Sequence, residues 1–164
     1  MIKNICGLAL GLLITLGAVG QDLKQLPNAT LKTVDGKTLE ASALVTGKPV
    51  VISFWATWCS PCKRELNTIA EVYEDWQEET GVSLVAVSVD DARTKSRVAP
   101  YINGQNWDYT VLLDENSDFR RSMGVNNVPH TFLLNGKGEI VYQHNNFAPG
   151  DEEELYEKIL EITE

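Results

Sequence analysis

Two cysteines separated by two residues, Cys59 and Cys62, are the residues of this chain whose type and spacing best suit chemistry. Three positions span nearly one turn of a helix, so both sulfurs can lie on one side of it within reach of a disulfide. A disulfide over so short a loop adds little to the stability of a fold. The pair is therefore more typical of thiol-disulfide exchange than of a structural crosslink.

The segments on either side of the pair favour a reactive thiol at Cys59. An apolar, β-branched run at Pro49–Trp55 predicts a buried strand, and Ser60–Glu79 has the spacing of an amphipathic helix. Cys59 then lies at the helix N-terminus, where free backbone N–H groups and the helix dipole stabilise a thiolate. Pro61 suits the first helical turn. We expect Cys59 to attack a substrate disulfide and Cys62 to resolve the mixed disulfide.

A zinc site is the other chemistry that the cysteines could support. His130 and His144 are the two histidines of the chain, and they would have to complete a Cys₂His₂ set. In zinc sites the two ligands of the second pair usually lie close to each other in the sequence, whereas these histidines are fourteen residues apart. The pattern therefore favours a redox pair that uses neither a metal ion nor an organic cofactor.

The first twenty residues have the pattern of an export signal. Lys3 precedes an uncharged, mostly apolar run at Ile5–Val19, and the small residues of Ala18–Gly20 predict cleavage before Gln21. The run is shorter than the roughly twenty residues that span a bilayer as a helix. We therefore expect an exported, periplasmic protein with a cleaved signal, and retention of the signal as a membrane anchor is the alternative.

Length and charge limit what remains after the signal. We expect a signal peptide over residues 1–20 and one domain over residues 21–164. Cleavage of the signal peptide would remove Cys6. Charged residues comprise 23 Asp and Glu against 14 Lys and Arg, for a net charge of −9. Because phosphate binding needs a basic surface, nucleic acid is excluded as a partner.

Strands and helices are predicted to alternate along the rest of the chain. The predicted elements are a hairpin with an Asp-Gly turn at Leu31–Leu39, strands at Val82–Val89 and Tyr109–Leu113, helices at Ala92–Asn103 and Ser117–Met123, and a hairpin of Pro129–Leu134 with Glu139–His144.

A last helix closes the predicted order. We expect it to start with Asp151 as N-cap and Glu154 in the reciprocal capping position, and to bury Leu155, Ile159 and Ile162. Strands that alternate with helices and end in a hairpin and a helix predict an α/β fold. In this fold a mixed central sheet is flanked by helices.

Three separated motifs carry a family resemblance that covers nearly the whole mature chain. Phe54–Lys63, which reads FWATWCSPCK, resembles the active-site stretch of the thioredoxin superfamily. Arg64-Glu65, Asp35-Gly36-Lys37 and Val128–Leu133 are more similar to its exported TlpA-like and ResA-like branch. The resemblance implies a thioredoxin-like fold with an N-terminal β-hairpin and a strand-helix insertion at Val82–Asn103. It also implies thiol-disulfide exchange in the bacterial periplasm or its equivalent.

The resemblance also implies roles for individual residues. Pro129 matches a proline whose preceding peptide bond is cis in the family and lies against the cysteines, so the Val128 backbone would pair with an extended substrate strand. Trp58 is expected to contact substrate at the lip of the site. His130 either lies near the sulfurs, where its protonated form would favour the thiolate, or points outward from its strand. Trp55 is expected in the apolar wall or the core.

Glu65 matches an active-site glutamate of the ResA-like pattern. A carboxylate near the cysteines raises thiol pKa values and can relay a proton to or from Cys62. The alternative is an acidic residue that merely suits the first turns of a helix. Cytoplasmic thioredoxins carry a buried carboxylate six residues before the first cysteine, and Ser53 stands there in this chain. Any proton relay would then use Glu65, water or the substrate.

These observations predict a thiol-disulfide oxidoreductase that reduces protein disulfides as a monomer. A membrane thiol electron carrier would return the Cys59–Cys62 disulfide to the dithiol. The family resemblance implies cytochrome c maturation or general periplasmic thiol reduction as candidate pathways. One alternative is an oxidant of the same fold that forms disulfides. Another is a non-enzymatic copper chaperone resembling the Sco-type carriers, although those proteins space their cysteines by three residues and not two.

Overall fold

The apolar strand before the cysteines lies at the centre of the sheet. The computed structural model describes residues 25–105 and 107–163, so the predicted signal peptide and Cys6 lie outside the described residues. Strand β3 (Val50–Trp55) is buried along its whole length. It pairs in parallel with β4 (Ser83–Ser88) and antiparallel with β6 (His130–Leu134). Neighbours on both edges and helices on both faces explain why every residue of β3 except Ser53 is apolar.

Four further strands complete a seven-stranded mixed sheet in the order β2-β1-β5-β4-β3-β6-β7. The sheet edges are hairpins, as the turn signals predicted. The further strands are β1 (Thr30–Thr33), β2 (Thr38–Glu40), β5 (Thr110–Leu113) and β7 (Ile140–Asn145).

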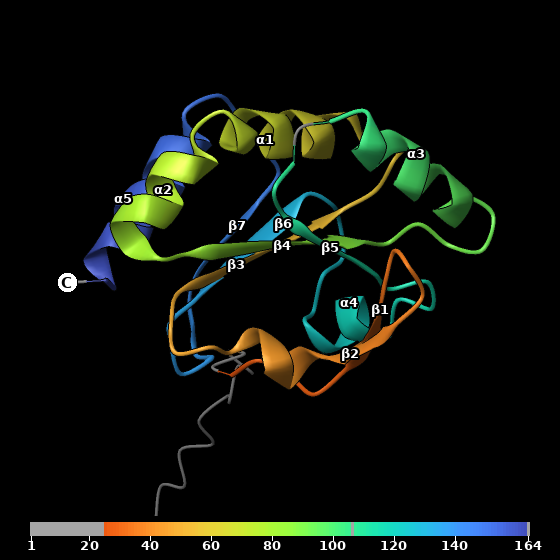
Figure 1. Cartoon of the computed structure of the whole chain (residues 1–164), viewed down its shortest axis with the longest axis horizontal. Helices are drawn as coiled ribbons and strands as arrows, with labels where there is room; N and C mark the ends of the chain where they lie inside the picture. The colour runs from red at the N-terminus through yellow and green to blue at the C-terminus, as the bar shows by residue number, and fades with distance from the viewer. Residues whose placement is uncertain (1–24, 106, 164) are drawn as a thin grey trace, which may run out of the picture.

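Helices cover both faces of the sheet (Figure 1). Helices α1, α2, α3 and α5 lie on one side, and α4 lies on the other. The α/β class predicted from the alternation of elements is therefore confirmed. The helices are α1 (Ser60–Ala70), α2 (Tyr73–Thr80), α3 (Val98–Asn103), α4 (Asp118–Ser122) and α5 (Asp151–Glu161), with short 3₁₀ turns η1 (Ala41–Leu44) and η2 (Lys95–Arg97).

The prediction of a single helix over Ser60–Glu79 is wrong. The chain forms two helices there, α1 and α2, with a break at Glu71 and Val72. After the break, the Tyr73 hydroxyl accepts a hydrogen bond from the Leu84 N–H of β4 at 2.9 Å. No glycine or proline marks the break, and the apolar spacing continues through it. The sequence therefore gives no local sign that the helix ends there. The change of direction is set by packing against the sheet rather than by a local signal.

The helix predicted at Ala92–Asn103 is also too long. Its first residues form a turn in which the Asp91 carboxylate accepts hydrogen bonds from the Arg93 N–H and guanidinium. The Asp91 carbonyl accepts from the N–H groups of Thr94 and Lys95. Because this turn satisfies the local donors, regular helix begins only at Val98. The strand and helix expected within residues 82–103 are both present as β4 and α3.

The predicted cap of the last helix is wrong as well. Asp151 is the first helical residue, and the N-cap is Gly150 with a φ of 102°. The Asp151 side chain instead accepts a hydrogen bond from the Ala148 N–H, and the Glu154 side chain accepts one from Tyr142. Leu155 and Ile159 are buried as predicted, whereas Ile162, at the end of the helix, is only partly buried.

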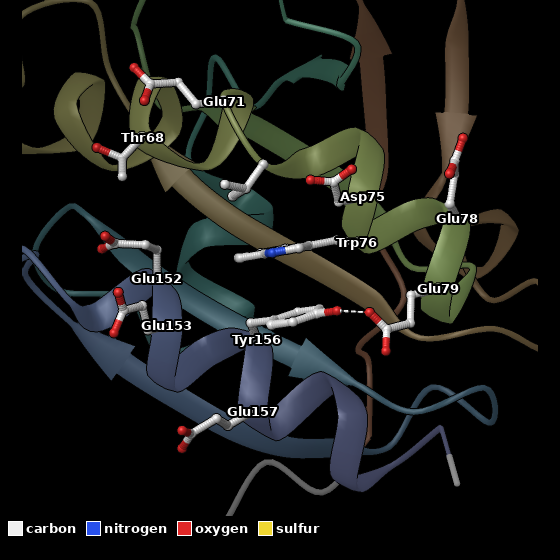
Figure 2. A pocket seen from close by; sticks show the side chains of 11 residues that line it. Thr68, Glu71, Asp75, Trp76, Glu78, Glu79, Glu152, Glu153, Tyr156 and Glu157 are labelled. Atoms are coloured by element: carbon white, nitrogen blue, oxygen red, sulfur yellow. Dashed lines mark hydrogen bonds between the residues drawn. The ribbon is translucent and has the colours of Figure 1, made fainter.

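An acidic groove of about 990 Å³ separates α1 and α2 from α5 (Figure 2). Trp76 of α2 and Tyr156 of α5 stack in it, with ring centres 5.1 Å apart and planes 9° from parallel. The Tyr156 hydroxyl donates to Glu79. Neither cysteine lines this groove. Among the described residues, no helix combines the length and apolar character needed to cross a membrane.

Candidate active site

Cys59 and Cys62 form a disulfide at the start of α1, with their Cα atoms 5.4 Å apart. Cys59 is the N-cap of the helix, and its sulfur accepts a hydrogen bond from the Cys62 N–H at 3.3 Å. Pro61 lies in the first turn, where its lack of an N–H costs nothing. Cys59 is 5% exposed, whereas Cys62 is fully buried. The first cysteine is therefore the one that a substrate can reach.

The start of β6 lies against the attacking sulfur. The Val128–Pro129 peptide bond is cis, and the Val128 carbonyl oxygen is 3.7 Å from Cys59 Sγ. Val128, Pro129 and His130 line a cleft of about 480 Å³ together with Asn145 of β7. The predicted substrate-contacting residues on this segment therefore line one cleft, which Val128 connects to Cys59 although neither cysteine lines it.

The two tryptophans near the cysteines have different environments. Trp58 is 57% exposed, directly before Cys59, as expected for a residue at the lip of the site. Trp55 is fully buried and packs edge-to-face on Trp107 with ring centres 5.1 Å apart. Trp55 is therefore a core residue.

The loop between β3 and α1 is tied to the end of β4 by a buried carboxylate. Asp90 is fully buried and accepts hydrogen bonds from the Thr57 N–H at 2.8 Å and the Thr57 hydroxyl at 2.6 Å. The Ser88 hydroxyl donates to the same carboxylate at 2.9 Å. Because Thr57 is two residues before Cys59, this contact fixes the approach of the chain to the helix N-terminus.

Glu65 is one helical turn beyond Cys62, and its side chain is 1% exposed. Three donors surround its carboxylate, one from each of three neighbouring strands. The Thr131 hydroxyl donates to Oε1 at 2.6 Å, His144 Nε2 is 3.0 Å from the same oxygen, and the Ser53 hydroxyl donates to Oε2 at 3.5 Å. A merely solvated acidic residue in a first helical turn would not be buried in this way.

The sheet register explains how these donors meet. Ser53 of β3 pairs with Thr131 of β6, and Thr131 pairs with His144 of β7. Side chains opposite one another on adjacent strands share a face of the sheet, so all three point towards α1. The Glu65 carboxylate reaches the space above Ser53. It therefore stands over the position that carries a carboxylate in cytoplasmic thioredoxins.

His130 is one residue from Thr131 and so points to the opposite face of the sheet. Its ring stacks on Phe132 with ring centres 4.3 Å apart, and its Nε2 is 3.0 Å from the Gln143 side-chain oxygen. Burial lowers the pKa of His130 below its ordinary value, and the hydrogen bond to Gln143 only partly offsets this. Burial therefore favours the neutral imidazole of His130 over the charged form that would stabilise a thiolate.

The histidines also do not meet as ligands would. His144 contacts Glu65 on one face of the sheet, and His130 lies on the other face. Within residues 25–105 and 107–163, no three side chains of the metal-binding types come together as a ligand set.

Several polar residues of the site were not predicted from the sequence. Thr131 and Asp90 were given no role in it, His144 was considered only as a zinc ligand, and Ser53 was noted only for its lack of a carboxylate. Thr131 and Ser53 are polar residues inside strands that are otherwise apolar and fully buried. A polar residue inside a buried strand implies a buried partner, and that was the available signal.

Comparison with known proteins identifies the family of this site. Residues 23–143 match the AhpC/TSA family. The thiol-disulfide oxidoreductase ResA of Bacillus thuringiensis is 32% identical over 146 residues, which cover 80% of this chain and 82% of the relative. This chain belongs to the ResA-like proteins of the AhpC/TSA family. It is a thiol-disulfide oxidoreductase of that type, and Cys59 and Cys62 are its CxxC pair.

Solved structures similar to this ResA-like chain have the same fold. A thioredoxin-like protein from Porphyromonas gingivalis is 48% identical, with a TM-score of 0.75 over 84% of this chain and 91% of that one. A crystal structure assigned as a candidate thiol:disulfide interchange protein DsbE from Chlorobium tepidum is 27% identical. Its TM-score is 0.76 over 86% of this chain and 96% of that one. The thioredoxin-like fold that the motifs implied is therefore confirmed.

Proposed function

We propose that this ResA-like oxidoreductase reduces protein disulfides outside the cytoplasm. The observation that carries the proposal is the unequal burial of its two cysteines. Cys59 is at the mouth of the site, at the N-terminus of α1 and beside the Val128 carbonyl, and Cys62 is enclosed behind it. This arrangement suits an attacking thiol and a resolving thiol.

The cycle proceeds in two exchanges. The Cys59 thiolate attacks one sulfur of a substrate disulfide, which forms a mixed disulfide and releases the other substrate sulfur as a thiolate. The Cys62 thiolate then attacks Cys59 Sγ and displaces the second substrate thiolate. The substrate gains two electrons, and the Cys59–Cys62 disulfide forms. A membrane thiol electron carrier would supply the two electrons that restore the dithiol.

The residues around the cysteines would bind the substrate and manage protons. Trp58 and the Val128 backbone would contact an extended substrate strand, with Pro129 holding Val128 in place. His130 lines the same cleft, and its burial there favours the neutral imidazole. Glu65 would exchange a proton with Cys62, since both lie buried on one face of α1.

Export is supported by the sequence pattern of the N-terminus. We propose that residues 1–20 are a cleaved signal peptide and that residues 21–164 are the mature domain. Retention of the signal as an anchor would place the same domain at the membrane surface. Cytochrome c maturation and general thiol reduction are the candidate pathways.

An oxidant that forms disulfides would use the same two sulfurs in the reverse direction. Only the reduction potential of the pair separates these two directions. A copper chaperone would instead bind the metal through the reduced cysteines and would transfer no electrons to a disulfide.

An insulin-reduction assay on the mature domain, driven by dithiothreitol, tests the function. We expect Cys59→Ser and Cys62→Ser each to abolish acceleration above the background rate. Cys62→Ser should also trap a mixed disulfide through Cys59, whereas Cys59→Ser should not. Ser60→Ala is the matched control, because it changes an exposed residue between the cysteines and keeps both thiols. Full activity in both cysteine variants would contradict the proposal.

A further inference from the structure

The cradle of Glu65 contains a histidine whose hydrogen-bonding role is set by its partner. A carboxylate can only accept hydrogen bonds, so the Ser53 and Thr131 hydroxyls and His144 Nε2 must all act as donors towards it. Nε2 of His144 therefore carries a hydrogen. Its other ring nitrogen, Nδ1, is buried and has no hydrogen-bond partner within the part of the chain that the structure describes.

His144 is the outermost residue of this cluster. It lies on β7 at the edge of the sheet, and its side chain is 13% exposed, against 1% for Glu65. The Tyr142 ring lies 5.9 Å from the His144 ring on the same strand. His144 thus closes the side of the Glu65 pocket that would otherwise open towards solvent.

Both strong donors meet the same carboxylate oxygen. Thr131 and His144 contact Oε1, whereas the only donor to Oε2 among the described residues is Ser53, at the longer distance of 3.5 Å. Two close contacts on one oxygen fix the plane of the carboxylate and leave Oε2 with spare acceptor capacity. Oε2 is thus the oxygen free to take a proton from a neighbour.

We propose that His144, together with Thr131, is a positioning residue for the exchange reaction. It holds Glu65 so that the carboxylate accepts the proton of the Cys62 thiol during resolution of the mixed disulfide. The proton moves from Cys62 Sγ to Glu65, the Cys62 sulfur bonds to Cys59 Sγ, and the bond from Cys59 to the substrate breaks. The departing substrate thiolate then recovers a proton from Glu65 or from water. This inference rests on the proposed function, because it assigns residues to one of its two steps.

Other titratable groups near the carboxylate do not share its hydrogen bonds. The Glu65 charge acts on the pKa of Tyr109, which burial raises, and on the pKa of His130, which burial lowers. The Tyr109 hydroxyl donates to the Leu66 carbonyl, and His130 contacts Gln143. His144 is therefore the titratable side chain in direct contact with Glu65.

Stopped-flow mixing of the reduced mature domain with 5,5′-dithiobis(2-nitrobenzoate) separates the two steps. Attack by Cys59 releases the first nitrothiobenzoate in a phase that depends on reagent concentration. Resolution by Cys62 releases the second in a concentration-independent phase. We expect His144→Phe, which keeps a ring and removes the donor, to slow the second phase about tenfold at pH 7, a partial loss of a proton-transfer contribution. The rate should recover at high pH, where Cys62 ionises without help.

Companion variants identify the route of the effect. His144→Gln keeps an N–H donor of similar reach and should restore most of the rate. Thr131→Val removes the other close donor at nearly constant volume and should change the pH profile in the same direction. Adding His144→Phe to Glu65→Gln should cause no further loss, because both changes remove the same contribution.

Tyr142→Phe is the matched control. It keeps the ring of Tyr142 on the same strand and removes only a solvent-exposed hydrogen bond to Glu154, so it should leave both phases unchanged. An unaltered second phase in both His144→Phe and Thr131→Val would overturn the inference. So would additive losses in the double variant. Failure of the first phase in the unmodified protein would instead contradict the proposed function.

Discussion

At the scale of single residues, burial separates the roles of chemically identical groups. Cys59 and Cys62 both lie at the start of one helix, yet Cys59 keeps 5% of its surface exposed and Cys62 keeps none. The two histidines differ instead in the face of the sheet on which they lie. His144 contacts a carboxylate on the α1 face of the sheet, while His130 stacks on Phe132 on the opposite face. Period-two alternation along β6 and β7 is sufficient to produce this difference.

The environment of His130 leads to a pH-dependent prediction. Because burial lowers its pKa in the folded protein, the unfolded chain binds a proton at a higher pH than the folded one does. As the pH falls below about 6.5, the ordinary value, this difference should reduce the free energy of unfolding. Above that pH, His130 should make no pH-dependent contribution.

NMR titration of the His130 ring protons measures this directly, with His144→Gln used to assign the two histidine signals. We expect a titration midpoint for His130 below about 6.5. A midpoint at or above that value would show that burial does not lower the pKa of His130, and would contradict this prediction.

At the scale of elements, the active site depends on contacts between the ends of strands. The loop before Cys59 is held by Asp90 after the end of β4, and the carbonyl of Val128, just before β6, lies 3.7 Å from Cys59 Sγ. Parallel pairing of β3 and β4 brings their carboxyl ends to one edge of the sheet, which is where α1 begins. The nucleophile is thus positioned by the sheet and not by the helix alone.

Asp90→Ala should test this arrangement. It would leave the buried donors of Thr57 and Ser88 without an acceptor, which we expect to lower the free energy of unfolding by about 3 kcal/mol. Urea unfolding of the oxidised domain would measure the loss. Asp91→Ala is the matched control, because Asp91 is the next residue and its carboxylate pairs with the exposed Arg93. We expect it to lower the free energy of unfolding by less than Asp90→Ala does. Equal losses in both variants would contradict a special role for Asp90.

Elements with strong local signals were predictable from the sequence. The buried strand at β3, the capping position of Cys59 and the two hairpins follow from apolar runs, helix-end preferences and turn residues. The break after α1 was not predictable, because Val72 continues the apolar pattern and the break is set by packing on β4. Likewise, the last helix starts from a glycine with positive φ, although the acidic residues after it had the spacing of a capping box.

The Glu65 cradle shows why part of the site could not be predicted. Glu65 itself was named from its spacing to Cys62 and from the family resemblance. Its partners Ser53, Thr131 and His144 are far apart in the sequence and meet only through the register of three strands. Register depends on long-range pairing, which a single sequence does not reveal.

At the scale of the whole molecule, the acidic surface and the redox site are separate features. Much of the excess negative charge is gathered on α2 and the first turn of α5, around the groove in which Trp76 and Tyr156 stack (Figure 2). The cysteines lie at the opposite end of α1, where the Val128 carbonyl just before β6 reaches Cys59. The net charge of −9 therefore describes solubility and excluded partners rather than catalysis.

The direction of electron flow is also a property of the whole protein, because it depends on the relative stabilities of the oxidised and reduced forms. Reduction potentials of proteins with this fold span from about −270 mV for thioredoxin to about −120 mV for the strong oxidant DsbA. A reductant that is recharged by a membrane carrier should lie towards the thioredoxin end of this range.

Redox titration of the mature domain tests the central claim most directly. The domain would be equilibrated in dithiothreitol buffers of defined potential, and the fraction of reduced Cys59 and Cys62 would be measured by alkylation and mass. We predict a single two-electron transition closer to about −270 mV than to about −120 mV, and its loss in Cys59→Ser and Cys62→Ser. A potential above about −150 mV would contradict the account and make this protein an oxidant.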